Sequence, residues 1–125
     1  MAMSLRTPKA EAFEMAAKAG AFDIEFLDRV TFSDRGLARE VLQLFDRQAD
    51  SLLQVIRDTE STGMRLEIAH RLKGAARGVG AFSVPRAAEE IETASDEIEL
   101  ANAVSLLTAR VMEARMALAS LIGNA

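Results

Sequence analysis

The chain has 125 residues, a formal net charge of −4 and no cysteine. A chain of this length can bury a hydrophobic core without cross-links, and the missing cysteines exclude thiol chemistry, disulfides and zinc held by thiolates. The net negative charge argues against a general affinity for nucleic acid or anionic lipid, both of which prefer a basic surface. We therefore expect one domain, residues 1–125, with neither nucleic acid nor a membrane as its partner.

The N-terminal part of the chain begins with ten residues that contain no apolar run. They predict neither a signal peptide nor a membrane span, so we expect a cytoplasmic protein. Residues 1–32 then predict two short helices, at 8–19 and 23–30, which are separated by Gly20 and cap one end of the molecule. Aromatic and leucine side chains at helical spacing usually pack inward. Three are therefore expected in the core rather than on a partner surface: Phe22, Phe26 and Leu27.

Residues 33–122 show helical periodicity throughout and no alternating strand pattern, which predicts an all-α fold. Apolar residues recur at steps of three and four, and capping residues and glycines separate the runs. These patterns predict four long helices, at 34–57, 62–80, 83 to 98–100, and 100–122. Long helices joined by short connections favour an antiparallel, up-and-down four-helix bundle.

The only histidine, His70, lies in the second of these long helices. At about 100° per residue, Lys73, Gly74 and Arg77 fall within about 60° of the direction of His70 on successive turns. We therefore expect one exposed strip that carries an imidazole, two cations and a position without a side chain. The apolar residues of this helix point the other way and predict its buried face: Ile68, Ala69, Leu72, Ala75, Ala76 and Val79.

The charge around His70 is positive, because residues 65–86 hold five cations and one anion. Two cations beside an imidazole favour its neutral, nucleophilic form, and they can also neutralise the oxygens of a phosphoryl group. Gly74 costs the helix about 1 kcal/mol relative to alanine, but it leaves room for the backbone of another protein. An ordinary solvated helix face with an idle histidine is the alternative interpretation.

Residues 70–81, HRLKGAARGVGA, resemble the signature of the histidine-containing phosphotransfer (HPt) domain. In that family a leucine, a lysine and a glycine follow the histidine at two, three and four residues, and a glycine–alanine pair comes later. The likeness continues loosely into the acidic stretch 89–92. The resemblance implies a phosphorelay carrier in two-component signal transduction, with His70 as the phosphorylated nucleophile, Lys73 as its charge partner and Gly74 as the clearance position. Arg77 is added as a second charge partner from helical geometry alone.

Such a carrier takes a phosphoryl group from the aspartyl phosphate of one receiver domain and passes it to an aspartate of another. The imidazole, through Nε2, attacks phosphorus in line while the carboxylate leaves. The resemblance implies response-regulator receiver domains and a hybrid sensor histidine kinase as partners of a monomer. We expect Mg²⁺ on the receiver and no metal or cofactor on this chain. The chain has no Gly-rich phosphate loop, so ATP-dependent kinase activity of its own is not expected.

Three other classes of helical protein compete with this interpretation. The dimerisation helix of a sensor histidine kinase usually places an acidic residue after its histidine, where this chain has Arg71. A carboxylate-bridged dimetal bundle needs two Glu-x-x-His pairs, and Glu67 with His70 supplies one. A noncatalytic interaction module, whose basic helix binds an acidic partner surface, predicts binding that survives His70→Ala.

Overall fold

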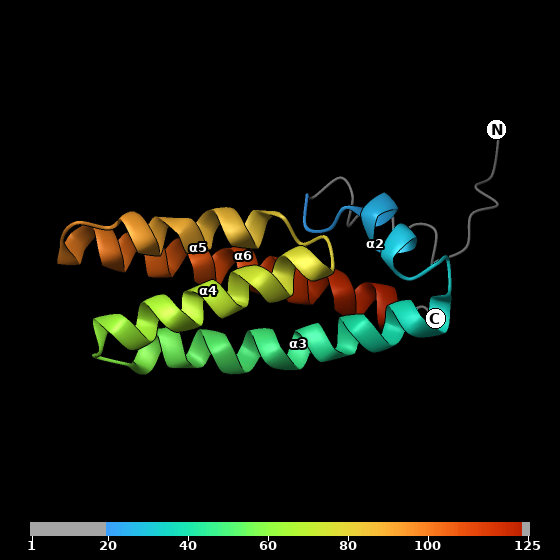
Figure 1. Cartoon of the computed structure of the whole chain (residues 1–125), viewed down its shortest axis with the longest axis horizontal. Coiled ribbons are helices and arrows are strands. Elements are labelled where there is room, and N and C mark those ends of the chain that lie inside the picture. The colour runs from blue at the N-terminus through green and yellow to red at the C-terminus, as the bar shows by residue number, and fades with distance from the viewer. Residues whose placement is uncertain (1–19, 124–125) are drawn as a thin grey trace, which may run out of the picture.

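The computed structural model describes residues 20–123, and the regular structure of that part is entirely helical. This confirms the predicted all-α fold there, whereas the helix predicted at 8–19 lies outside the described residues. None of the described helices is both long enough and apolar enough to cross a membrane. The helices follow one another in this order (Figure 1): α2 Ile24–Val30, α3 Arg35–Asp58, α4 Thr62–Gly78, α5 Ser83–Thr93 and α6 Glu97–Gly123.

Helices α3 to α6 lie lengthwise beside one another, and α2 lies at one end of them (Figure 1). Helix α3 packs against α4 and α6, and α5 packs against the same two helices. Their shared interior is apolar, and burial of each aliphatic or aromatic side chain contributes about 1.5–3 kcal/mol. The largest buried apolar side chains come from all five helices: Leu27, Phe45, Ile56, Leu72, Val84, Leu107 and Val111.

The turn between α4 and α5 contacts α2 through Gly80, whose φ of 80° is left-handed. A Cβ at this position would lie 3.0 Å from the Asp23 carbonyl oxygen and 3.1 Å from the Phe26 ring. The Gly80 carbonyl also accepts a 2.8 Å hydrogen bond from the Asp23 amide. Glycine alone combines this backbone angle with such a close approach. Of the three side chains predicted in the core, Phe22 and Leu27 are buried and Phe26 is half-buried.

Helix α5 is shorter than predicted, because the chain begins a new helix before residues 98–100. The Asp96 carboxylate accepts a 2.7 Å hydrogen bond from the Glu99 amide. The Glu99 carboxylate in turn accepts 2.7 Å hydrogen bonds from the amide and the hydroxyl of Ser95, which hold the pKa of Glu99 below its usual range. Ile98 is consequently 75% exposed in the first turn of α6 instead of lying on the apolar face of α5.

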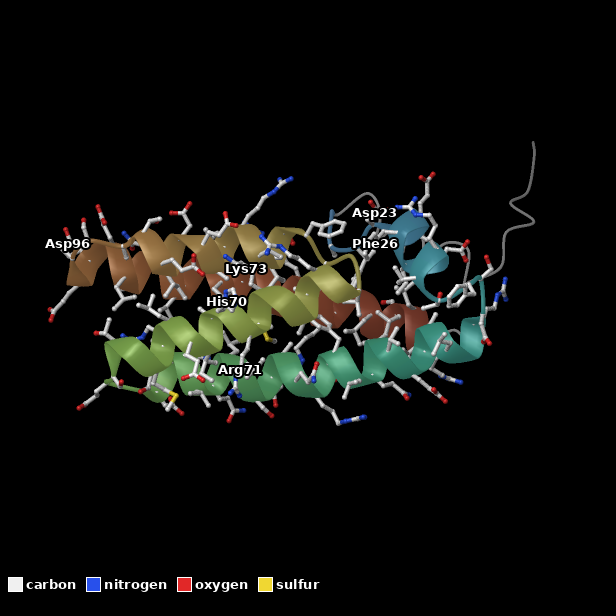
Figure 2. All side chains as sticks on the ribbon, viewed as in Figure 1. Asp23, Phe26, His70, Arg71, Lys73 and Asp96 are labelled. Atoms are coloured by element: carbon white, nitrogen blue, oxygen red, sulfur yellow. The ribbon has the colours of Figure 1, made fainter. Side chains whose placement is uncertain are left out.

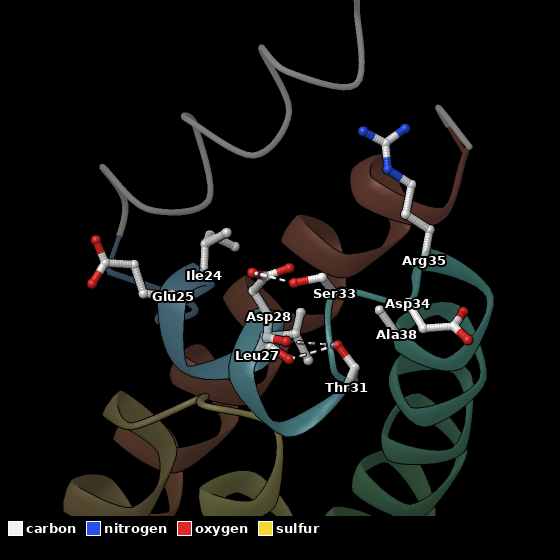
Figure 3. Close-up of a pocket in the computed structure, with 9 residues that line it drawn as sticks. All are labelled: Ile24, Glu25, Leu27, Asp28, Thr31, Ser33, Asp34, Arg35 and Ala38. Atoms are coloured by element: carbon white, nitrogen blue, oxygen red, sulfur yellow. Dashed lines mark hydrogen bonds between the residues drawn. The ribbon is translucent and has the colours of Figure 1, made fainter.

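A hollow of about 420 Å³ lies between α2 and the start of α3 (Figure 3). Phe32 and Ser33 in the loop beside it have positive φ angles of 54° and 58°. The Ser33 hydroxyl donates a 3.0 Å hydrogen bond to the Asp28 carboxylate, and the Thr31 hydroxyl donates one of 2.7 Å to the Leu27 carbonyl. These bonds hold the loop in a conformation that costs L-residues about 1–2 kcal/mol each. None of the predicted site residues lines this hollow.

Candidate functional site

His70 lies near the middle of α4 and is exposed (Figure 2). Within residues 20–123 its imidazole has no hydrogen-bond or ion-pair partner. Helix α4 begins where predicted, because the Ser61 hydroxyl accepts a 3.1 Å hydrogen bond from the Met64 amide. The exposure of His70 confirms its predicted outward orientation. Ala75 on the predicted buried face is half-buried, and its other members are buried: Ile68, Ala69, Leu72, Ala76 and Val79.

Gly74, one turn beyond His70, is exposed, and a Cβ built on it would find no heavy atom within 4 Å. Neither a tight helix contact nor a left-handed backbone angle therefore explains a glycine at this position. A glycine inside a helix is nevertheless destabilising by about 1 kcal/mol relative to alanine. The open space at Gly74 agrees with the expectation that no side chain projects over the turn next to His70.

A second hollow, of about 620 Å³, lies between α3 and α4 beside Gly74. Leu52 and Arg47 of α3 and Arg71 and Ala75 of α4 line it together with Gly74. The hollow is completed by Gln48 and Ser51 of α3. The sequence pattern did not predict this feature, because it depends on which helix packs beside α4. The open side of Gly74 thus leads into a depression that a protruding group of another protein can enter.

Leu66 also lies on the exposed face of α4 that carries His70, and the sequence interpretation missed it. It precedes His70 by four residues, so it lies one turn earlier in nearly the same direction. Its side chain belongs to the exposed apolar residues, with 39% of its surface accessible. The four-residue spacing from His70 was the available signal. Leu66 and Gly74 therefore flank the imidazole along α4 with an apolar contact on one side and free space on the other.

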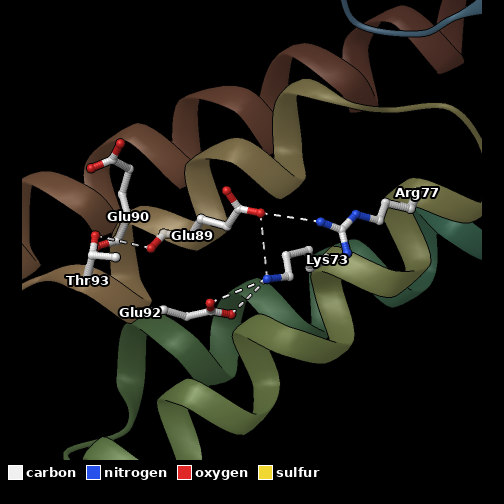
Figure 4. Close-up of polar contacts among 6 residues, drawn as sticks. All are labelled: Lys73, Arg77, Glu89, Glu90, Glu92 and Thr93. Atoms are coloured by element: carbon white, nitrogen blue, oxygen red, sulfur yellow. Dashed lines mark hydrogen bonds and ion pairs between the residues drawn. The ribbon is translucent and has the colours of Figure 1, made fainter.

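Lys73 does not lie on an exposed strip, which corrects the prediction. Only 8% of its surface is exposed, and its ammonium lies 3.1 Å from Glu92 Oε1, 3.4 Å from Glu92 Oε2 and 3.8 Å from Glu89 Oε1 (Figure 4). Both glutamates belong to α5, which packs against α4. The offset of about 60° from His70 turns Lys73 toward α5, so its aliphatic stem is covered while its ammonium reaches a carboxylate.

Arg77 is exposed as predicted, but its guanidinium is also paired, at 3.3 Å from Glu89 Oε1. Glu89 thus contacts both Lys73 and Arg77 (Figure 4). We call Lys73, Arg77, Glu89 and Glu92 the α4–α5 ion cluster. It joins two cations to two carboxylates, so its formal charge is zero. The predicted excess of positive charge beside His70 is therefore offset by residues of the next helix.

Arg71, the residue after His70, is likewise paired, with its guanidinium 3.3 Å from the Glu67 carboxylate one turn earlier. A charge count along the sequence includes Glu67 but omits the glutamates of α5, because these come later in the chain and meet α4 only in the fold. The acidic stretch 89–92 was visible as a feature of the sequence, but its partners were not.

Within residues 20–123, no group of three or more carboxylate and imidazole side chains is arranged to hold a metal ion.

Comparisons with protein-family models, with curated proteins and with solved structures found no match to this chain. The resemblance to the HPt signature therefore depends on residues 70–81. The geometry adds an exposed imidazole that no other residue of 20–123 pairs with, an open glycine one turn away, and a buried lysine held by carboxylates of the neighbouring helix.

Proposed function

We propose that this chain is a phosphorelay carrier of the HPt type, in which His70 accepts a phosphoryl group from a receiver aspartyl phosphate and passes it to another receiver. The observation that carries the proposal is the exposed imidazole of His70, which has no partner within the described part of the chain and stands beside the open side of Gly74. The attacking nitrogen of an imidazole must be reachable by its substrate, and its lone pair must not be taken up by a hydrogen bond or a cation. His70 meets both conditions.

The proposal includes an antiparallel, up-and-down four-helix bundle formed by α3 to α6. Three features support it: connections of three or four residues at 59–61, 79–82 and 94–96, the length of the helices, and their pairing of neighbours. Helices joined by so few residues reverse direction at each connection. Such a bundle would hold His70 on a rigid helix, which suits a reaction that depends on positioning.

The transfer step itself requires little of this chain. The lone pair of His70 Nε2 forms the bond to phosphorus while the bond from phosphorus to the receiver carboxylate oxygen breaks, and the electron pair leaves with the carboxylate. The proton on Nδ1 stays on the ring. Mg²⁺ belongs to the proposed receiver partner, and Lys73 would supply positive charge from a Cβ about 5–6 Å away from that of His70.

Docking of a receiver domain would use the surface around His70. Leu66 offers apolar contact area, and the hollow between α3 and α4 beside Gly74 can accept a protruding side chain. The alternative of a noncatalytic module that binds an acidic surface receives less support. The three cations that follow His70 already have carboxylate partners: Arg71, Lys73 and Arg77. Their charges are therefore partly offset, which weakens their attraction for a further acidic group.

The test mixes the purified chain with a receiver domain that carries a labelled aspartyl phosphate, in the presence of Mg²⁺. We expect the label to move to an acid-labile, base-stable phosphohistidine in the wild-type chain and to be absent from His70→Gln. The variant should keep its thermal unfolding midpoint, because the imidazole is exposed and has no partner within residues 20–123. Transfer that persists in His70→Gln would overturn the proposal. Stable receiver binding by His70→Ala, with no transfer by the wild type, would favour the interaction module.

A further inference from the structure

Lys73 is paired before any phosphoryl group reaches the site. Its ammonium lies against both oxygens of Glu92, at 3.1 and 3.4 Å, and at a longer 3.8 Å from Glu89. An ammonium has three N–H donors and no acceptor. The carboxylates therefore occupy donors, and offset positive charge, that phosphoryl oxygens on His70 would need. A phosphoryl group adds a charge of about −1.5 to −2 at neutral pH. It would therefore meet an ion cluster whose formal charge is zero.

The two carboxylates hold Lys73 from different sides. Glu89 also contacts Arg77, one turn beyond Lys73 on α4, and Figure 4 shows Glu92 on the side of the ammonium that is remote from Arg77. On α4, Arg77 follows Lys73 and His70 precedes it. Because Glu92 lies on the side remote from Arg77, it lies toward the turn that carries His70. Side chains of a helix lean toward its N-terminus, which directs the Lys73 ammonium the same way. Glu92 is therefore the closer competitor for the charge of Lys73.

We propose that Glu92 competes with a phosphoryl group on His70 for the Lys73 ammonium and thereby makes the phosphohistidine less stable and easier to transfer. This inference rests on the proposed function. In the unphosphorylated chain Glu92 binds the ammonium. When the Nε2–phosphorus bond forms, the ammonium changes partner from the Glu92 carboxylate to a phosphoryl oxygen, while Glu89 keeps its contact with Arg77. When the phosphoryl group leaves, Glu92 takes the ammonium back. Glu92 is a positioning residue that acts through Lys73.

The test uses phosphoimidazole as the donor, so it does not depend on any receiver domain. The bond between phosphorus and the small imidazole breaks, the bond to His70 Nε2 forms, and free imidazole is released. The equilibrium constant of this exchange reports the stability of the phosphohistidine. Glu92→Gln removes the competing charge and should raise the constant by roughly 3- to 10-fold. Glu92→Asp, which keeps the charge on a shorter side chain, should give a smaller increase.

Glu90→Gln is the matched control, because Glu90 is an exposed carboxylate of α5 without an ion-pair partner in the described part of the chain. It should leave the constant unchanged. In a Lys73→Ala background the effect of Glu92→Gln should fall to less than half, whereas a purely structural role would persist there. Thermal unfolding checks that every variant is folded, and Glu89 remains to pair Lys73 in Glu92→Gln.

An unchanged or lowered constant in folded Glu92→Gln and Glu92→Asp would overturn the inference. An equal increase in Glu90→Gln would do the same, since it would show a general effect of charge on α5. These results differ from failure of the proposed function. In that case the wild-type chain takes no phosphoryl group from any receiver domain, although phosphoimidazole can still modify His70.

Discussion

The two sides of α4 that flank His70 differ in what occupies them. Toward α3, no heavy atom of the described residues lies within 4 Å of a Cβ built on Gly74, and the surface opens into a hollow of about 620 Å³. Toward α5, Lys73 is buried, and its ammonium is held by Glu89 and Glu92. The open space beside Gly74 and the carboxylates that pair Lys73 are therefore supplied by different neighbouring helices. A substitution on the α3 side is expected to change docking of the proposed receiver domain without changing the charge of the α4–α5 ion cluster. A substitution on the α5 side is expected to change the charge of the cluster without changing docking.

The α5 side gives the largest expected effect on rate. Lys73→Ala should slow phosphoryl transfer from a receiver domain by about 10- to 100-fold, because positive charge near the phosphoryl oxygens is lost. Single-turnover transfer kinetics measure this change at saturating receiver concentration. Arg110→Ala is the control, because Arg110 forms an ion pair with Glu113 on α6, away from α4. Transfer by Lys73→Ala at the wild-type rate would mean that the ion cluster has no part in the chemistry.

The α3 side is probed by Gly74→Gln, which places a side chain at the mouth of the hollow. We expect transfer at subsaturating receiver concentration to fall by about 10-fold, because the receiver is displaced from its docked position. Gly78→Gln is a matched control on the same helix, since a Cβ there also meets no heavy atom within 4 Å. Neither variant should lower the unfolding temperature, because glycine is the poorer helix former. An equal loss of transfer in both variants would contradict a special role for Gly74.

Arg77 should contribute least, although it belongs to the same ion cluster as Lys73. Its side chain is 54% exposed, and Glu89 is its one ion-pair partner among residues 20–123, so solvent and salt weaken its interactions. Arg77→Ala should slow transfer by about 2- to 3-fold, measured under the same conditions as Lys73→Ala. If the two variants slowed transfer equally, burial of Lys73 would not explain the difference between the two cations.

The sequence predicts the features of α4 that depend on the helix itself. Periodicity places His70 opposite the buried face and begins the helix near residue 62. In the structure the Ser61 hydroxyl caps this first turn by accepting a hydrogen bond from the Met64 amide. The all-α fold follows from the same periodicity. The sequence also contains a signal for the start of α6, and hence for the end of α5, because Asp96 and Glu99 have the spacing of a helix-capping pair. The apolar spacing that runs on to Ile98 predicts a longer helix, whereas in the structure this capping pair begins α6 at Glu97.

The burial of Lys73 could not be predicted from the sequence, for a physical reason. A residue offset by about 60° from an exposed neighbour lies at the border between the two faces of a helix. Its burial is then decided by the helix that packs beside it. Here α5 covers that border and supplies Glu89 and Glu92. The hollow beside Gly74 is unpredictable for the same reason, because α3 forms its other wall.

The contrast between Gly74 and Gly80 has a consequence for how this chain tolerates genetic variation. Gly80 has a left-handed backbone angle and touches α2, so selection for a folded molecule is enough to retain it. Gly74 has free space around it, and selection for folding alone would replace it with alanine or a polar residue. If the proposed phosphorelay role is correct, descendants that lose it should lose Gly74 first and keep Gly80.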